Sequence, residues 1–276
     1  DRDLLVIPNA AIHLNREVND GYKYKPHIDM LPLLGTKGDE NAFIKLIAKE
    51  IDEDPKLISD FDLQLYSRQK ATYFGINNEF ISSGRLDNLE MAYCSIMGLL
   101  DASSSDINIA FVAGNEEIGS MGLEGADSPL LSDTLRRISD SLELDNDIMV
   151  ANSFVVSADA SHAIHPNLAD LSDPNNFAVL NQGPVIKYSG RRSYMSDGYS
   201  GSVFKAIADR AGVNYQYYTN RSDQRGGVTI GPINTNHLSI PVVDVGNPTL
   251  AMHSASEVCG SKDLIDMIKI FKEFYK

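Results

Sequence analysis

The sequence has few cysteines, no long apolar run and no excess of basic residues, and each of these absences excludes a class of protein. Its two cysteines, Cys94 and Cys259, form neither a disulfide framework nor a Cys-x-x-Cys metal motif. No stretch approaches 18 consecutive apolar residues, so we expect no membrane span. The 24 basic and 38 acidic residues give a net charge of −14, which would repel a nucleic-acid backbone. We therefore expect no membrane or nucleic-acid partner and a reducing, cytoplasmic location.

The pattern of expected helices and strands changes near residue 76, which predicts two domains. Residues 1–76 combine extended segments with one amphipathic helix at 40–51, a pattern typical of a small α+β domain. Residues 77–276 alternate strand and helix patterns, which predicts an α/β fold with a largely parallel sheet and helices on both faces. The expected strands lie at 107–113, 153–158, 213–219 and 240–245, and the expected helices at 88–100, 128–142, 201–211 and from 261 onward.

Acidic and imidazole side chains stand at the ends of these elements. Glu116 and Glu117 follow the apolar run at 107–113, and Asp159 closes the next expected strand. Asp87 precedes a helix, and His253 follows the last strand. Ligands of an open α/β sheet collect at the carboxyl ends of its strands. Carboxylate and imidazole together are the ligands expected at a catalytic site for zinc or a similar divalent ion.

Each of these residues also has a simpler interpretation. Glu116 and Glu117 could be solvated loop residues, Asp87 a helix cap, Asp159 a turn acid and His253 a packed histidine. Placement of all of them at one edge of the same sheet favours a shared metal site over these separate explanations.

A series of short motifs lies along the whole chain. In order, they are AIHLNR at 11–16, EFI at 79–81, RLDNL at 85–89, EEIGS at 116–120, SAD at 157–159, HAIHPN at 162–167, GPVIK at 183–187, TIGPI at 229–233 and MHS at 252–254. In this order they closely resemble the aspartyl aminopeptidase family, which includes the vacuolar aminopeptidase I type. Members of that family are metallopeptidases that remove the amino-terminal residue of peptides.

The resemblance implies a hydrolase with two divalent metal ions, zinc by expectation, with cobalt or manganese also compatible. Asp87 would bridge the two ions, while Glu117, Asp159 and His253 would complete their protein ligands. Glu116 would be the general base that takes a proton from the attacking water. Two adjacent glutamates suit this division, because consecutive side chains diverge and one can face metal while the other faces water.

The resemblance also implies three substrate contacts and an oligomer. His165 would lie near the bound peptide, and Lys187 would meet an acidic first side chain of the substrate. His13 would reach into the active site of a neighbouring subunit, which would make residues 1–76 a dimerisation domain and 77–276 the catalytic domain. Family members form assemblies built from dimers, commonly dodecamers.

One departure from the family pattern leaves the function open. The family carries a His-x-Asp motif whose histidine binds one metal, and this sequence has no such motif. The sequence also lacks an initiator Met, and Leu5 follows Asp1–Leu4 where family members have further strand residues. We expect residues to be missing before Asp1 and after Leu4. The alternatives to an aminopeptidase preferring Asp or Glu are an incomplete homologue serving as a scaffold or assembly subunit, and a two-metal hydrolase acting on another amide or a glycoside.

Overall fold

The computed structural model describes residues 2–36 and 41–276, which form two compact units that meet in the sequence between Arg68 and Gln69. The first unit contains helices α1 (Pro26–Asp29) and α2 (Ala42–Ile51) and two short 3-10 helices, Val18–Asp20 and Pro55–Leu57. Helix α2 confirms the helix expected at 40–51, although residue 40 itself lies outside the described residues. In the described part of this unit, the extended segments form one isolated β-bridge, between Val6 and Leu33.

The second unit contains two mixed β-sheets. Strands β1 (Thr72–Phe74), β2 (Phe80–Ser83), β9 (Glu257–Gly260), β8 (Pro248–Leu250) and β4 (Ser161–His162) form the first sheet in that order. Strands β3 (Val155–Ala158), β7 (Val242–Gly246), β5 (Val185–Lys187) and β6 (Gln216–Tyr218) form the second. The pairs β3–β7, β5–β6 and β4–β8 are parallel, and the other pairs are antiparallel. The expected α/β fold is therefore present, but the expectation of a largely parallel sheet is not confirmed.

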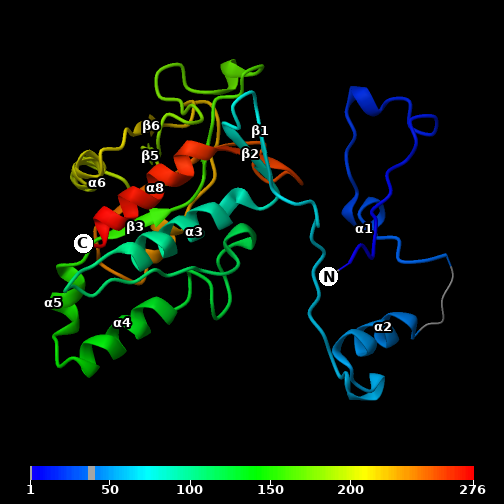
Figure 1. Cartoon of the computed structure of the whole chain (residues 1–276), viewed down its shortest axis with the longest axis horizontal. Coiled ribbons are helices and arrows are strands. Elements are labelled where there is room, and N and C mark those ends of the chain that lie inside the picture. The colour runs from blue at the N-terminus through cyan, green and yellow to red at the C-terminus, as the bar shows by residue number, and fades with distance from the viewer. Residues whose placement is uncertain (1, 37–40) are drawn as a thin grey trace. The chain divides into compact units, whose positions relative to one another are not determined.

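Helices α3 (Leu86–Asp101), α6 (Gly198–Ala211) and α8 (Ser261–Phe274) pack on the four-stranded sheet (Figure 1). Their apolar faces meet the sheet in one core, in which Phe204, Ile270 and Val243 are almost completely buried. Helices α4 (Leu130–Ser141) and α5 (Asn146–Ala151) pack against each other, and α7 (Ile230–Asn234) packs on β7. Helices α3, α4, α6 and α8 lie where the sequence predicts helices, at 88–100, 128–142, 201–211 and from 261 onward, whereas no helix was expected at α5 or α7.

The strand expected at residues 107–113 does not form. This segment has no ladder partner in the described part of the chain, and Ile107 and Val112 are about half exposed. An apolar run becomes a strand only where a neighbouring strand supplies hydrogen bonds to its backbone. The segment instead lines a groove beside β3, which lies at the edge of its sheet.

None of the helices in the described part of the chain has the length and apolar character that a membrane crossing needs. Both cysteines are buried and unpaired. Burial raises the pKa of both thiols far above the usual range, so they are packed and unreactive.

Helices α3 and α8 pack tightly on each other at Gly98. A Cβ added at Gly98 would lie 2.3 Å from the Cβ of Phe271 and 2.9 Å from the backbone nitrogen of Lys272. Alanine normally stabilises a helix by about 1 kcal/mol relative to glycine. Here we predict the opposite: Gly98→Ala should lower the free energy of unfolding by about 1–3 kcal/mol, the usual cost of overpacking.

Urea denaturation with linear extrapolation measures this change. The matched control is Gly198→Ala at the first residue of α6, where an added Cβ meets nothing within 4 Å. An unchanged or more stable Gly98→Ala protein would contradict the tight contact between α3 and α8.

Candidate metal centre

Three of the four predicted metal ligands converge at one point of the second unit. His253 Nε2 lies 3.0 Å from Asp87 Oδ2 and 3.0 Å from Glu117 Oε2. One ligand atom from each residue lies within 4.8 Å of the other two, a spacing that suits a single cation. Asp87 is at the start of α3, Glu117 is in a 3-10 turn (Glu116–Ile118), and His253 is in the turn after β8. Elements far apart in sequence therefore bring these side chains together.

Asp159 lies where the chain crosses from one sheet to the other, between β3 and β4. The chain crosses in the same way between β7 and β8, and the two crossings pack directly on each other. A Cβ at Gly246 would lie 1.8 Å from the carbonyl oxygen of Asp159, so only glycine allows this approach. The backbone N–H of Asp159 donates to the carbonyl of Val245 at 2.9 Å, which fixes the aspartate at the end of β3.

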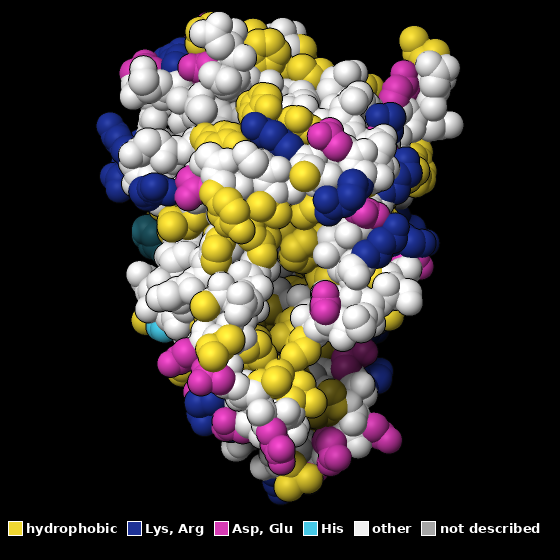
Figure 2. Space-filling view, turned by 90° about the vertical axis from the view of Figure 1, so that its left-hand side faces the viewer, with side chains coloured by type: hydrophobic (Ala, Val, Ile, Leu, Met, Phe, Trp, Pro, Cys, Tyr) yellow, Lys and Arg dark blue, Asp and Glu magenta, His cyan; other side chains and the backbone are white. Residues whose placement is uncertain are grey.

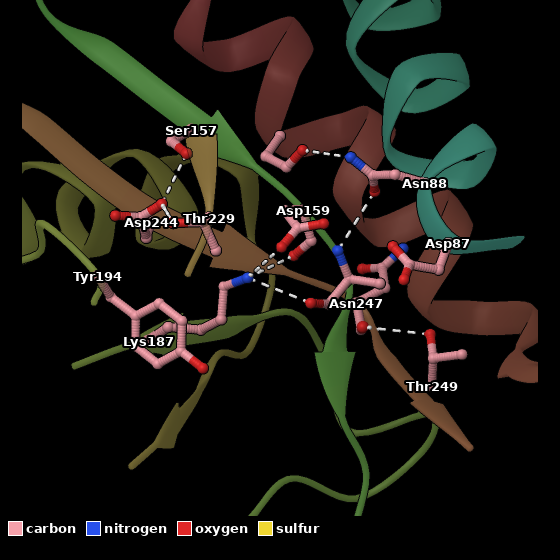
Figure 3. A network of polar contacts seen from close by, with 12 residues as sticks. Asp87, Asn88, Ser157, Asp159, Lys187, Tyr194, Thr229, Asp244, Asn247 and Thr249 are labelled. Atoms are coloured by element: carbon pink, nitrogen blue, oxygen red, sulfur yellow. Dashed lines mark hydrogen bonds and ion pairs between the residues drawn. The ribbon is translucent and has the colours of Figure 1, made fainter. Parts of the chain in front are cut away.

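The ammonium of Lys187 binds the Asp159 carboxylate, as Figure 3 shows. Its ammonium donates to Asp159 Oδ2 at 3.1 Å, to the Asp159 carbonyl at 2.9 Å and to the Ala160 carbonyl at 3.1 Å. These three acceptors match its three N–H donors. The side chain is 2% exposed, and its ammonium also lies over the ring of Tyr194. Lys187 is thus a buried partner of Asp159 in this structure.

Burial and the closeness of several carboxylates in this site raise the pKa values of two of them. Burial, followed by the charges of Asp159 and Glu117, raises the pKa of Asp87 to about 8. Burial and the same two charges raise the pKa of Glu116 to about 7, against a smaller opposing effect of Lys187 and His253. Desolvation and like charge both favour the neutral acid. A cation bound here would therefore stabilise the ionised carboxylates.

The residues present fit a divalent cation. Asp87 Oδ1 is buried and has no hydrogen-bond partner among the described residues, although buried carboxylate oxygens are normally paired. Two carboxylates and one imidazole are donors that zinc accepts in proteins. A cation at Asp87, Glu117 and His253 would supply both the missing partner and the missing charge.

A groove of about 400 Å³ opens beside these residues and reaches Glu116, Glu117 and Asp159. Apolar side chains make up most of its wall, from residues 107–113, α4, β3 and the end of α8. Figure 2 shows hydrophobic side chains gathered around a hollow on this face of the molecule. The groove can therefore admit a ligand with apolar groups next to the carboxylates.

Two further candidates are not members of this cluster of ligand atoms. His165 is exposed in the loop after β4, and its Nδ1 accepts from the backbone N–H of Asn167 at 3.2 Å. His13 is exposed in the first unit. Their predicted substrate contacts stay predictions.

Comparison with known proteins identifies the family of the chain. The model of the aminopeptidase I zinc metalloprotease (M18) family matches residues 1–275. The chain belongs to the M18 family. A probable M18 family aminopeptidase 2 of Clostridium novyi is 46% identical over 283 residues, and the match covers 100% of this chain and 65% of that relative. This M18 chain thus spans 65% of the length of that curated relative.

Solved structures agree with this membership. The cryo-EM structure of the Ape4 and Nbr1 complex contains a chain with a TM-score of 0.92 and 33% identity, and the match covers 100% of this chain and 58% of that one. The mApe1 dodecamer of S. cerevisiae matches with a TM-score of 0.75 and 25% identity, over 91% of this chain and 61% of that one. The structural match therefore extends over both units of the chain.

Two residues of this M18 chain that support the centre were not found from the sequence. The Asn88 side chain donates to the Ala158 carbonyl at 2.8 Å and accepts from the Ala160 N–H at 3.2 Å, so it brackets Asp159 (Figure 3). Glu257 accepts backbone N–H groups beside the cluster. Asn88 follows Asp87 directly and resembles a helix-start residue, which hid its role. Glu257 could have been found from the sequence as the one charged residue of strand β9, which it begins.

The cluster predicts that zinc binding depends on His253. We expect His253→Ala to weaken zinc affinity by more than about 100-fold, because loss of a ligand should cost more than loss of a residue that only orients one. Competition with a chromophoric chelator measures the affinity. The control is His237→Ala, since His237 also pairs with a carboxylate, Asp127, at 3.0 Å but lies outside the cluster. Equal affinity of the two variants would exclude His253 as a ligand.

Proposed function

We propose that this chain provides the catalytic centre of a metal-dependent aminopeptidase, which hydrolyses the first peptide bond of peptides. The observation that carries the proposal is the convergence of Asp87, Glu117 and His253 beside the half-buried acid Glu116. Membership of the M18 zinc metalloprotease family supports the same reaction.

We assign two divalent ions to the centre, with zinc as the expected metal. Asp87, Glu117 and His253 would hold one ion. Asp87 and Asp159 would hold the other, because the charge of Asp159 acts on Asp87 more strongly than that of any other neighbouring carboxylate. Bound ions of this kind supply Lewis acidity to the attacking water and to the scissile carbonyl.

The residues of the chain then handle the proton. Glu116 has a pKa raised to about 7, so near neutral pH it can accept a proton from water and return it to the leaving amine. Its neighbour Glu117 points to His253 and is thereby kept apart from this role. The groove beside both residues can hold the side chains of the peptide.

Replacing Glu116 tests its role as the base. Glu116→Gln keeps the size of the side chain but cannot accept the proton, so we expect kcat to fall by about 10² or more while zinc affinity stays within a few-fold of the parent. Hydrolysis of amino-acid p-nitroanilides with added zinc measures kcat. Glu143→Gln, an exposed change after α4, is the matched control. Retained kcat in Glu116→Gln would contradict the proposed base.

The geometry changes the role that we propose for Lys187. All three of its N–H donors already meet protein acceptors, so a substrate carboxylate would have to displace Asp159 or a carbonyl. We propose that Lys187 acts mainly by holding Asp159. The preference for Asp or Glu as the first residue then rests on the family resemblance.

A substrate comparison tests both points. We expect Lys187→Met to lower kcat/KM by about tenfold or more on Asp- and Leu-p-nitroanilide alike, since loss of a partner of a buried charge costs several kcal/mol. A loss confined to the Asp substrate would instead assign Lys187 to substrate recognition. In the parent chain, a higher kcat/KM on the Asp and Glu substrates than on the Leu substrate would support the acidic preference.

We further propose that the first unit is a dimerisation domain. Among its described residues, Ala48 is the single buried hydrophobic side chain, so the unit has almost no core of its own. Many large apolar side chains are exposed there, including Leu14, Leu31 and Phe61. Burial against a second copy would remove this apolar area from water. His13 is part of this exposed surface and would reach a partner's active site, in an assembly that can be as large as a dodecamer.

A further inference from the structure

Glu257 is a buried carboxylate that joins two of the cluster residues through their backbones. It begins strand β9 and is 2% exposed. Its Oε2 accepts the backbone N–H of Asp87 at 2.9 Å, and its Oε1 accepts the backbone N–H of His253 at 2.7 Å. One side chain therefore fixes the main chain at both residues.

Neither N–H group belongs to regular secondary structure. Asp87 has non-helical backbone angles (φ −76°, ψ 108°) at the start of α3. His253 has a positive φ of 66° in the turn after β8, a conformation that costs energy for a residue with a side chain. The carboxylate oxygens of Glu257 accept these N–H groups in place of the carbonyls that a helix or a ladder would otherwise provide.

Glu257 is itself held rigidly. Its strand pairs with β2 on one side, where Glu257 lies opposite Ser83, and with β8 on the other. The carboxylate thus links two neighbouring turns to the centre of a sheet. Such a link fixes the distance between the side chains of Asp87 and His253 before any cation is present.

We propose that Glu257 is a positioning residue, which orients Asp87 and His253 for a divalent cation without touching the cation itself. The inference rests on the proposed function, in which these two residues are ligands. A carboxylate is required because both acceptors must face N–H donors. In Glu257→Gln, the amide would present one oxygen and one NH₂, and the NH₂ would oppose one of the two N–H groups.

The chain offers a matched control at Asp263 on α8. Asp263 is completely buried, and its two oxygens accept the backbone N–H groups of Asn181 at 2.6 Å and Gly183 at 2.9 Å. The chemistry equals that of Glu257, but no cluster residue is bound. Asp263→Asn therefore reports the general cost of breaking such a pair, separately from any effect on the cluster.

The test is the zinc affinity of the 276-residue chain, measured by chelator competition with zinc ions alone and without substrate. We expect Glu257→Gln to weaken zinc binding by about 10- to 100-fold, the usual effect of losing a residue that orients metal ligands. Asp263→Asn should bind zinc within about twofold of the parent, although both variants should melt at lower temperature. Equal zinc affinity in Glu257→Gln and the parent would overturn the inference, as would an equal loss in Asp263→Asn.

A second pair of variants decides the matter if Glu257→Gln does not fold. Glu257→Asp keeps the charge but is one methylene too short to reach both N–H groups, and Asp263→Glu changes length by the same amount. We expect weakened zinc binding in the first variant and unchanged binding in the second, and equal binding in both would overturn the inference. A parent chain that binds no zinc would instead refute the proposed function on which the inference rests.

Discussion

Repulsion among carboxylates is the constraint on which the active region depends. Asp87, Glu116, Glu117 and Asp159 act on one another, and burial strengthens their interaction by excluding water. Lys187 and the imidazole of His253 are the basic side chains in contact with this group in the described structure. Burial raises the pKa values of Asp87 and Glu116, and the charges of Asp159 and Glu117 raise them further. Divalent cations would balance the negative charge and would leave Glu116 as the group that exchanges protons.

The fold opposes this repulsion partly through hydrogen bonds to the backbone at and beside the acidic residues. Asn88 brackets Asp159, Glu257 fixes Asp87 and His253, and the glycine at 246 lets the two sheet crossings touch. Asp87 Oδ1 is left without a hydrogen-bond partner among the described residues and can therefore accept a ligand. An arrangement of this kind is preorganised, because the cost of bringing like charges together is met during folding.

The sequence predicted the longer helices and the convergence of Asp87, Glu117 and His253, because both leave local signals. Helical periodicity marked α2, α3 and α8, and the Glu116–Glu117 pair stood out at the end of an apolar run. The mixed sheets could not be predicted, since strand direction depends on crossings such as that at Asp159. The failure of residues 107–113 to form a strand has a similar cause: pairing depends on a neighbour distant in sequence. The burial of Lys187 and the role of Glu257 depend on tertiary contacts that leave no periodic pattern.

The most direct test is a crystal structure of the zinc-loaded chain with data collected at the zinc absorption edge. The account predicts an anomalous difference peak within bonding distance of Asp87, Glu117 and His253, at the point where their ligand atoms already meet. A zinc peak elsewhere, with these three side chains still paired to one another, would contradict the assigned metal centre.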